Sequence, residues 1–367
     1  MHRRPVLSVM VTFIFPMLLG VTLATGQQPA QTPAAAASTE MAPLHVPARI
    51  IPVPTDVSPE LQKAIARLPA LREQGAPAIP KSIEGWRKFI AAGDNASLQQ
   101  LAQLRKTFPV NVSSQVISGV KTYTVVPEQI APENGSRVLV HFHGGGYLLA
   151  GGEVGIGEAI LMAYHGRIKV ISVDYRMPPD YPFPAALDDA VAVWKEVIKG
   201  CNPKNVGLFG TSAGGGLTLA TVHKLKELKL PLPGAIAPGT PWSDLAGTGD
   251  TYFTNDYIDG VIGNYEGFLR GCVELYAGKH DLKDPFISPL YGDFRGFPPS
   301  ILTTGTRDLL QSDTVRVHRK LRQAGVEARL QVFEAMSHAE YLLLFDSPES
   351  REAFEEIARF FDTHLGK

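Results

Sequence analysis

The chain has 367 residues, a formal net charge of −1 at pH 7 and a hydrophobic fraction of 44%. The length suits one α/β domain with inserted segments, and the hydrophobic fraction is typical of a globular protein with one sizeable core. The near-zero charge lacks the basic footprint of proteins that bind nucleic acid or acidic membranes, so we expect no nucleic-acid partner.

A signal peptide is predicted at residues 1–26. A basic start precedes an apolar run from Val6 to Leu23, and residues 24–26 have the small-x-small pattern of a signal-peptidase site. The alternative is a permanent membrane anchor, but the run is at the lower edge of the ~20 residues needed and contains Pro16. We expect a protein exported to the periplasm or secreted, with no other membrane segment; Sec or Tat export stays open.

Two segments precede the first predicted strand. Residues 27–57 are rich in Ala, Pro, Thr and Gln and are predicted to be a disordered linker, because they cannot bury enough apolar surface to fold alone. Residues 58–108 are predicted to be helical, within a cap segment assigned to residues 58–115, since Ser58 and Pro59 suit a helix start and apolar residues then recur at helical spacing. We expect these helices to form an N-terminal cap.

From residue 116 to residue 367, short apolar strands alternate with amphipathic helices. This alternation predicts an α/β fold with a mostly parallel sheet covered by helices on both faces. The predicted strands are Val120–Val126, Arg137–Phe142, Ile168–Val173, Val206–Phe209, Ile301–Thr303 and Ala328–Phe333. The predicted helices are Pro184–Ile198, Gly214–Leu228, Thr314–Gln323 and Glu349–His364.

A long connection interrupts this alternation at about residues 244–291. It contains Gly and Asp turns and one predicted helix near Tyr265–Tyr276. Insertions of this length often form a lid or a pocket wall, so we expect it to complete the cap. The chain has only two cysteines, Cys201 and Cys272, which is too few for a disulfide framework; whether they pair stays open.

A nucleophile elbow is predicted at Gly210-Thr211-Ser212-Ala213-Gly214. This G-x-S-x-G pattern follows a predicted strand and opens a predicted helix, which is the context that the motif needs. Gly210 and Gly214 allow a sharp turn without a Cβ clash, and the helix N-terminus favours a developing negative charge. The structural alternative is a glycine-rich turn in which Ser212 caps the helix.

A second glycine-rich segment, His143-Gly144-Gly145-Gly146, follows another predicted strand. The N–H groups of Gly145, Gly146 and Ala213 could together hold an oxyanion. A dinucleotide-binding loop is excluded because Leu149 stands where its third glycine is needed. Since this segment and the elbow serve the same mechanism, together they favour a serine hydrolase.

The triad order expected after such an elbow is serine, acid, histidine. Asp308 follows the fifth predicted strand and its turn, and His338 follows the sixth. Both are therefore expected at the carboxyl edge of the sheet. Asp313 is the rival acid, but we expect it to cap the helix predicted to begin at Thr314.

His141 and His143 form an H-x-H pair on one predicted strand, a pattern that can bind a metal. No further His or Cys cluster joins the pair in the sequence. We therefore predict neither a metal nor a cofactor.

These motifs resemble the hormone-sensitive-lipase-like family of α/β hydrolases, the bacterial family IV esterases. The resemblance rests on residues 143–146, 210–215, 175–189 and 240–244. It implies an α/β-hydrolase fold with an eight-stranded, mostly parallel sheet and a helical cap. Within the family, residues 308–341 are most similar to monoterpene ε-lactone hydrolases. Two residues depart from the pattern: many members have Asp where Thr211 stands and Pro where Leu309 stands.

The motifs and the resemblance predict a carboxylesterase or lactonase that cleaves a short-chain ester or lactone through an acyl-enzyme on Ser212. Tyr147 and Trp242 are candidate pocket residues, with packing in the core as the alternative. The same triad could instead act on amides or carbamates or transfer acyl groups. A non-catalytic ligand receptor is disfavoured because His338 is present. The natural substrate, its stereochemistry and the formation of a homodimer stay open.

Overall fold

The computed structural model describes residues 43–73 and 78–367. The predicted signal peptide and residues 27–42 of the predicted linker lie outside the described residues. The chain divides into two units, residues 1–51 and 52–367, and residues 43–51 contain neither helix nor strand. No helix in the described ranges is both long enough and apolar enough to span a membrane.

One eight-stranded sheet organises residues 52–367, with the strand order β1-β2-β4-β3-β5-β6-β7-β8. β2 is antiparallel to β1 and β4, and every other neighbouring pair is parallel. The predicted α/β fold with a mostly parallel sheet is therefore confirmed. The strands are β1 (Val110–Ile117), β2 (Val120–Pro127), β3 (Val138–Phe142), β4 (Val170–Val173), β5 (Val206–Thr211), β6 (Ala235–Gly239), β7 (Ser300–Gly305) and β8 (Ala328–Phe333).

Two of these strands, β1 and β6, are absent from the sequence prediction. β1 begins at Val110, inside the range assigned to the cap helices, so the sheet starts earlier than expected. Its side chains are mostly exposed, which leaves only a weak apolar pattern, but it pairs with β2 along its whole length. β6 contains Pro238 and few β-formers, yet β5 and β7 flank it on both sides. Pairing with neighbours therefore overrides its low strand propensity.

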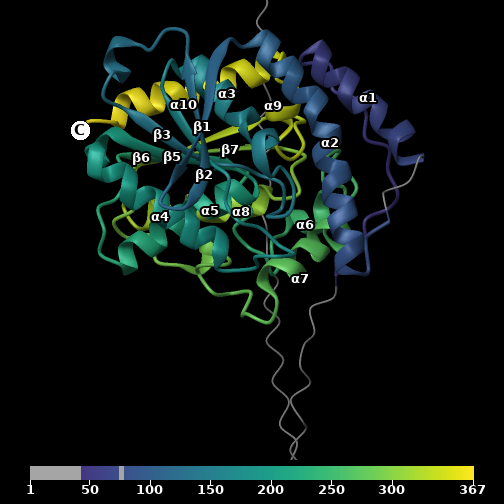
Figure 1. Cartoon of the computed structure of the whole chain (residues 1–367). Helices are drawn as coiled ribbons and strands as arrows, with labels where there is room; N and C mark the ends of the chain where they lie inside the picture. Colours follow the sequence, from purple (N-terminus) through teal and green to yellow (C-terminus); the bar gives the residue numbers. More distant parts are fainter. Residues whose placement is uncertain (1–42, 74–77) are drawn as a thin grey trace, which may run out of the picture. The chain divides into compact units, whose positions relative to one another are not determined.

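Helices cover both faces of the sheet, as Figure 1 shows. α3 (Gly157–Gly166) and α10 (Pro348–His364) pack together on one face. The opposite face carries α4 (Ala185–Gly200), α5 (Ala213–Glu227) and α8 (Gln311–Gln323). Each face has its own cluster of buried apolar side chains. This arrangement leaves the ends of the strands, rather than the faces of the sheet, free to build a site.

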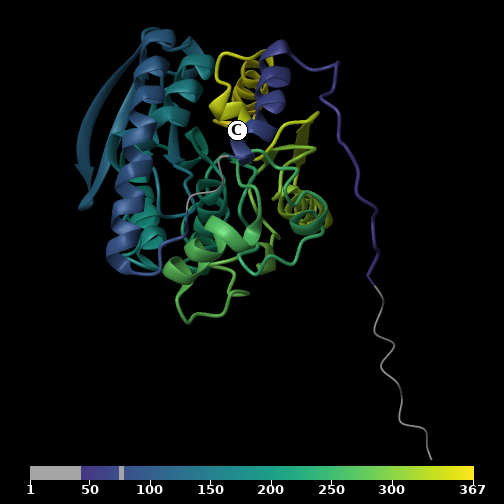
Figure 2. The same ribbon diagram turned by 90° about the vertical axis from the view of Figure 1, so that its right-hand side faces the viewer.

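The N-terminal helices are α1 (Pro59–Glu73) and α2 (Ile83–Thr107). Ser58 caps the N-terminus of α1 as expected, because its Oγ accepts a hydrogen bond from the Leu61 N–H at 3.2 Å. α2 (blue in Figure 2) runs along one side of the strands and their helices. Its Trp86 belongs to the apolar cluster of one face and its Leu101 and Leu104 to that of the other. α2 therefore bridges the two halves of the core.

The insertion contains α6 (Thr251–Thr254), a π-helical turn at Tyr265–Leu269 and α7 (Arg270–Ala277). The single helix predicted at Tyr265–Tyr276 is thus two pieces. The cause is Gly267, whose φ of −88° and ψ of −117° are not helical. The remaining helix, α9 (Glu340–Leu343), follows β8.

Candidate active site

Ser212 lies on a sharp turn between β5 and α5. Its φ of 62° and ψ of −122° are strained for a residue with a side chain, as a nucleophile elbow requires. A Cβ on Gly210 or Gly214 would lie 2.1 or 1.9 Å from the Phe142 carbonyl oxygen, so only glycine fits at either position. The Ser212 side chain makes no capping hydrogen bond to α5. The alternative role as a helix cap is therefore excluded.

The loop after β3 lies directly against this elbow. Gly145 and Gly146 have φ values of 98° and 64°, and a Cβ on Gly144 would lie 3.0 Å from the Thr211 carbonyl oxygen. In the described part of the chain, the N–H groups of Gly145, Gly146 and Ala213 have no acceptor. These three donors are the ones predicted for the oxyanion hole, and they remain available to a ligand.

His143 supports the shape of the oxyanion loop. Its ring stacks on Tyr175 with centroids 4.1 Å apart, and the Tyr175 hydroxyl donates to the His143 carbonyl oxygen at 2.7 Å. Burial lowers the pKa of His143 to about 3, so the ring is neutral at pH 7. Its Nδ1 can then donate to the Gly144 carbonyl oxygen at 2.9 Å.

The His141 side chain makes different contacts from those of His143. Its Nδ1 lies 2.9 Å from Ser172 Oγ and its Nε2 lies 3.1 Å from Glu158 Oε2. Across residues 43–73 and 78–367, no three His, Cys, Asp or Glu side chains are grouped so that they could hold a metal ion.

The structure brings Asp308 and His338 together. His338 Nδ1 lies 2.9 Å from Asp308 Oδ1, and both side chains are buried. Asp308 also accepts from the Leu310 N–H at 2.8 Å and from Thr304 Oγ1 at 2.7 Å. Burial lowers the pKa of His338, but the charge and hydrogen bond of Asp308 outweigh it and raise that pKa above its ordinary value of 6.5. The other ring nitrogen, Nε2, is buried and has no partner among the described residues.

Asp313 does not pair with a histidine, and the predicted capping role is wrong. α8 begins at Gln311 rather than at Thr314, so Asp313 lies within the first turn. Its carboxylate points away from its own helix and accepts from the N–H groups of Ser243 and Asp244 at 2.9 and 2.8 Å. Burial, reinforced by the charge of Asp244, raises the pKa of Asp313 well above 3.8.

A buried polar cluster behind Ser212 escapes sequence analysis. Thr211 Oγ1 lies 2.7 Å from Glu158 Oε1 on α3 and 2.6 Å from the hydroxyl of Tyr341 on α9. Thr211, which precedes Ser212, is therefore hydrogen-bonded to Tyr341, which lies three positions after His338. Thr211 is one of the two departures from the family pattern, which is the one sequence signal that pointed here.

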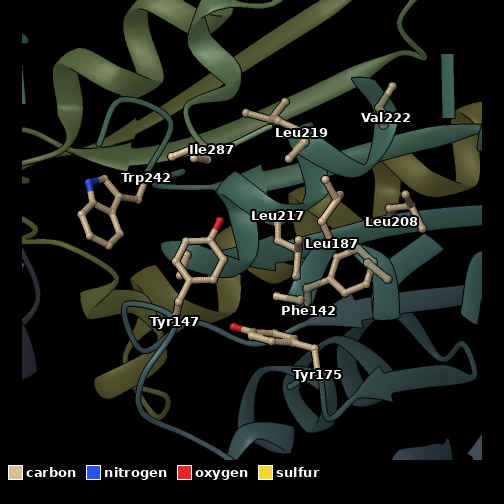
Figure 3. Packing of buried hydrophobic residues seen from close by; sticks show 14 of the residues in the cluster. Phe142, Tyr147, Tyr175, Leu187, Leu208, Leu217, Leu219, Val222, Trp242 and Ile287 are labelled. Atoms are coloured by element: carbon tan, nitrogen blue, oxygen red, sulfur yellow. The ribbon is translucent and has the colours of Figure 1, made fainter. Parts of the chain in front are cut away.

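Tyr147 and Trp242, the two candidate pocket residues, lie in the core (Figure 3). Their exposed fractions are 1% and 0%, and the Tyr147 ring stacks on Tyr276 with centroids 3.8 Å apart. Both side chains therefore pack in the core, which is the alternative to a pocket that the sequence left open.

The side chains above the oxyanion loop come instead from the insertion. A Cβ on Gly146 would lie 2.8 Å from Cys272 Sγ and 3.1 Å from the Phe268 ring. Phe268 stacks in turn on Phe89 of α2, with centroids 5.9 Å apart. α2 and the insertion thus cover the loop together. Cys272 is a free thiol, as is Cys201, so the two cysteines do not pair.

Comparisons with known proteins agree with this geometry. Residues 139–342 match the family described as having the alpha/beta hydrolase fold. An acetyl-hydrolase from Streptomyces hygroscopicus is 32% identical over 63% of this chain and 77% of the relative. The crystal structure of an esterase called E25 is 42% identical, with a TM-score of 0.85 over 88% of this chain and 99% of that chain. An esterase from the bacterial hormone-sensitive lipase family is 28% identical, with a TM-score of 0.72 over 84% of this chain and 99% of the other.

Proposed function

The chain belongs to the α/β-hydrolase family and is a carboxylesterase-type hydrolase, and from this premise we propose that it cleaves short-chain carboxylic esters and compact lactones through an acyl-enzyme on Ser212. One observation carries the proposal. Asp308 and His338 are hydrogen-bonded to each other and follow strands whose carboxyl ends lie at the same edge of the sheet as the strained turn at Ser212. The loop beside that turn presents N–H groups that have no acceptor among the described residues.

The proposed reaction begins when Ser212 Oγ attacks the acyl carbon and passes its proton to His338 Nε2. Asp308 holds Nδ1–H and stabilises the imidazolium that forms. The N–H groups of Gly145, Gly146 and Ala213 would stabilise the negative charge that develops on the carbonyl oxygen. His338 then protonates the leaving alkoxide, and the bond from the acyl carbon to the alcohol oxygen breaks. Water repeats the steps on the acyl-enzyme and releases the acid.

The preference for short acyl groups is supported by the cover over the oxyanion loop. The Phe268 ring and the Cys272 thiol lie close above Gly146, which leaves limited room for a long chain at the reacting carbon. The relative from Streptomyces hygroscopicus is named an acetyl-hydrolase, which favours a small acyl group here as well. Lactones are included because of the resemblance of residues 308–341 to monoterpene ε-lactone hydrolases.

Two measurements test the proposed function. A fluorophosphonate probe should label the wild-type protein and leave Ser212→Ala unlabelled. The wild type should hydrolyse p-nitrophenyl acetate and a six- or seven-membered lactone, whereas Ser212→Ala should lose about 10⁴–10⁶-fold in kcat. Residual activity of the variant within tenfold of wild type would exclude Ser212 as the nucleophile. Activity on the ester without activity on any lactone would overturn only the lactone part.

Export is a separate part of the proposal. The apolar run at Val6–Leu23 and the small residues after it support a cleaved signal peptide, so the mature chain should begin near Gln27. N-terminal sequencing of exported protein tests this. An intact Met1 in a washed membrane fraction would favour an anchor instead.

A further inference from the structure

Asp259 is a buried carboxylate of the insertion that lies against both triad partners of Ser212. It is 1% exposed. Its Oδ2 accepts from the N–H of Leu309 at 2.8 Å and from the N–H of His338 at 3.2 Å. These N–H groups belong to the residue directly after Asp308 and to the triad histidine itself. One oxygen atom therefore joins two loops that are thirty residues apart in sequence.

The other oxygen of Asp259 serves the insertion. Oδ1 accepts from the N–H groups of Val261 and Ile262 at 2.7 and 2.9 Å. Because both oxygens only accept, the ionised carboxylate suits this environment. Burial and the charge of Asp308 raise the pKa of Asp259 above its ordinary value, although His338 and the hydrogen bonds from backbone N–H groups oppose the increase.

Two neighbours of Asp259 strengthen the same connection. Asn255 Nδ2 donates to the carbonyl oxygens of Thr306 and Asp308 at 3.2 and 2.9 Å. The Gly260 N–H donates to Ser337 Oγ at 2.9 Å. Segment 255–260 is thus hydrogen-bonded to the loop that carries Asp308 and to the loop that carries His338. None of these hydrogen bonds involves the nucleophile elbow.

We propose that Asp259 is a positioning residue. It fixes the backbones of Asp308 and His338 relative to each other and links their positions to the folded insertion. The inference rests on the proposed hydrolytic function. Its physical basis is the steep dependence of catalysis on geometry, since a misplacement of about 1 Å can cost about a hundredfold in rate. Nothing in the chemistry requires the Asp259 side chain to touch the substrate, so its effect should fall on turnover rather than on binding.

The charge of Asp259 gives the proposal a second readout. The charged groups that act on His338 are Asp308 and Asp259, and both raise its pKa against the effect of burial. Asp259 is itself faced by Asp308, His338 and Glu340. Removing the charge at position 259 should therefore lower the pKa of His338.

The test uses the full chain and the variant Asp259→Asn. An amide has one acceptor atom, so it can serve either the two triad loops or the turn of the insertion, but not both. We expect kcat on p-nitrophenyl acetate to fall about 10- to 100-fold, with KM within about threefold of wild type. The acid limb of kcat/KM should also move to lower pH.

Two further variants separate position from charge. Asn255→Ala removes the bonds to the acid loop without changing the charge, so kcat should fall while the acid limb stays in place. Asp256→Asn removes a charge from an exposed position of the same segment and should match wild type in both readouts. Circular dichroism and thermal unfolding confirm that each variant is folded.

A folded Asp259→Asn protein with wild-type kcat would overturn the proposal, as would a loss confined to KM. If Asp259→Asn fails to fold, Asn255→Ala decides: an unchanged kcat there would overturn the connection between segment 255–260 and the triad. A wild-type protein without esterase activity would contradict the proposed function instead, so the two failures are distinguishable.

Discussion

Among single residues, Asp308 and Asp313 show how surroundings decide what a carboxylate does. Both are fully buried and lie five residues apart. Asp308 faces the His338 ring, whereas Asp313 accepts from two backbone N–H groups. Burial and the charge of Asp244 raise the pKa of Asp313, although these two hydrogen bonds oppose the increase. Both N–H groups bind the same oxygen of Asp313, so an amide of the same shape can still accept from them.

We therefore expect Asp308→Asn to lower kcat at least a hundredfold, because it removes the group that orients the His338 ring and stabilises the imidazolium. Asp313→Asn should keep kcat within about threefold of wild type. Steady-state kinetics on one p-nitrophenyl ester compares the two. A damaging Asp313→Asn together with a mild Asp308→Asn would reverse the assignment of the acid.

The pH dependence of hydrolysis should report His338. The ring must be neutral to accept the proton of Ser212, so kcat/KM should fall as the pH drops through the pKa of His338 in the free enzyme. That pKa is raised above 6.5 because Asp308 outweighs the effect of burial. The midpoint of the acid limb should therefore lie above 6.5 in wild type and shift down in Asp308→Asn. A midpoint below 6.5 in wild type would contradict this electrostatic account.

How far the sequence predicts the site follows from which residues carry local signals. The segments Gly210–Gly214 and His143–Gly146 carry a local signal because their glycines are needed for sharp turns, and the structure shows those turns. Asp259 and Phe268 carry no such signal. Their positions follow from how the insertion folds over the sheet, which depends on contacts distant in sequence.

At the scale of elements, the regular alternation of strands and helices was predictable, but β1 and β6 were not. β6 has the sequence Ala-Ile-Ala-Pro-Gly, and it is a strand because it fills the space between two parallel neighbours. The start of α8 at Gln311 has no local signal either, since no residue there makes a side-chain cap. Elements that depend on local chemistry are read well, whereas those that depend on neighbours are not.

The junction between β5 and α5 offers a test at this scale. Gly214→Ala would place a Cβ within 1.9 Å of the Phe142 carbonyl oxygen, so the backbone must shift, at a cost of about 1–3 kcal/mol. We expect a lower Tm and at least a tenfold loss of kcat. Gly200→Ala is the matched control, because a Cβ there meets nothing within 4 Å. Equal behaviour of the two variants would show that the elbow tolerates a side chain.

For the whole molecule, the cover formed by α2 and the insertion should set the size of the substrate. Burial of an acyl chain gains about 0.8 kcal/mol per CH₂ only until the space is full, so wild type should prefer acyl groups of about two to eight carbons. Phe268→Ala should shift the optimum of kcat/KM to longer p-nitrophenyl esters.

The control for that experiment is Phe253→Ala, which alters another phenylalanine of the insertion that is 75% exposed. Its chain-length profile should match wild type. A wild-type kcat/KM that keeps rising through palmitoyl esters, or a jump in rate above the solubility limit of the substrate, would show that the cover does not close the site.

The packing of α1 has a consequence for how the chain is made. In Figure 2, α1 (purple) lies beside α10 (yellow), and the Ser58 N–H donates to Glu349 Oε1 at 2.9 Å across 291 residues of chain. Leu61 and Ile65 share an apolar cluster with Phe354. During synthesis, the apolar face of α1 emerges first and lacks its partner until the last helix is complete. Such distant contacts slow folding, so the apolar face of α1 stays uncovered until synthesis reaches α10.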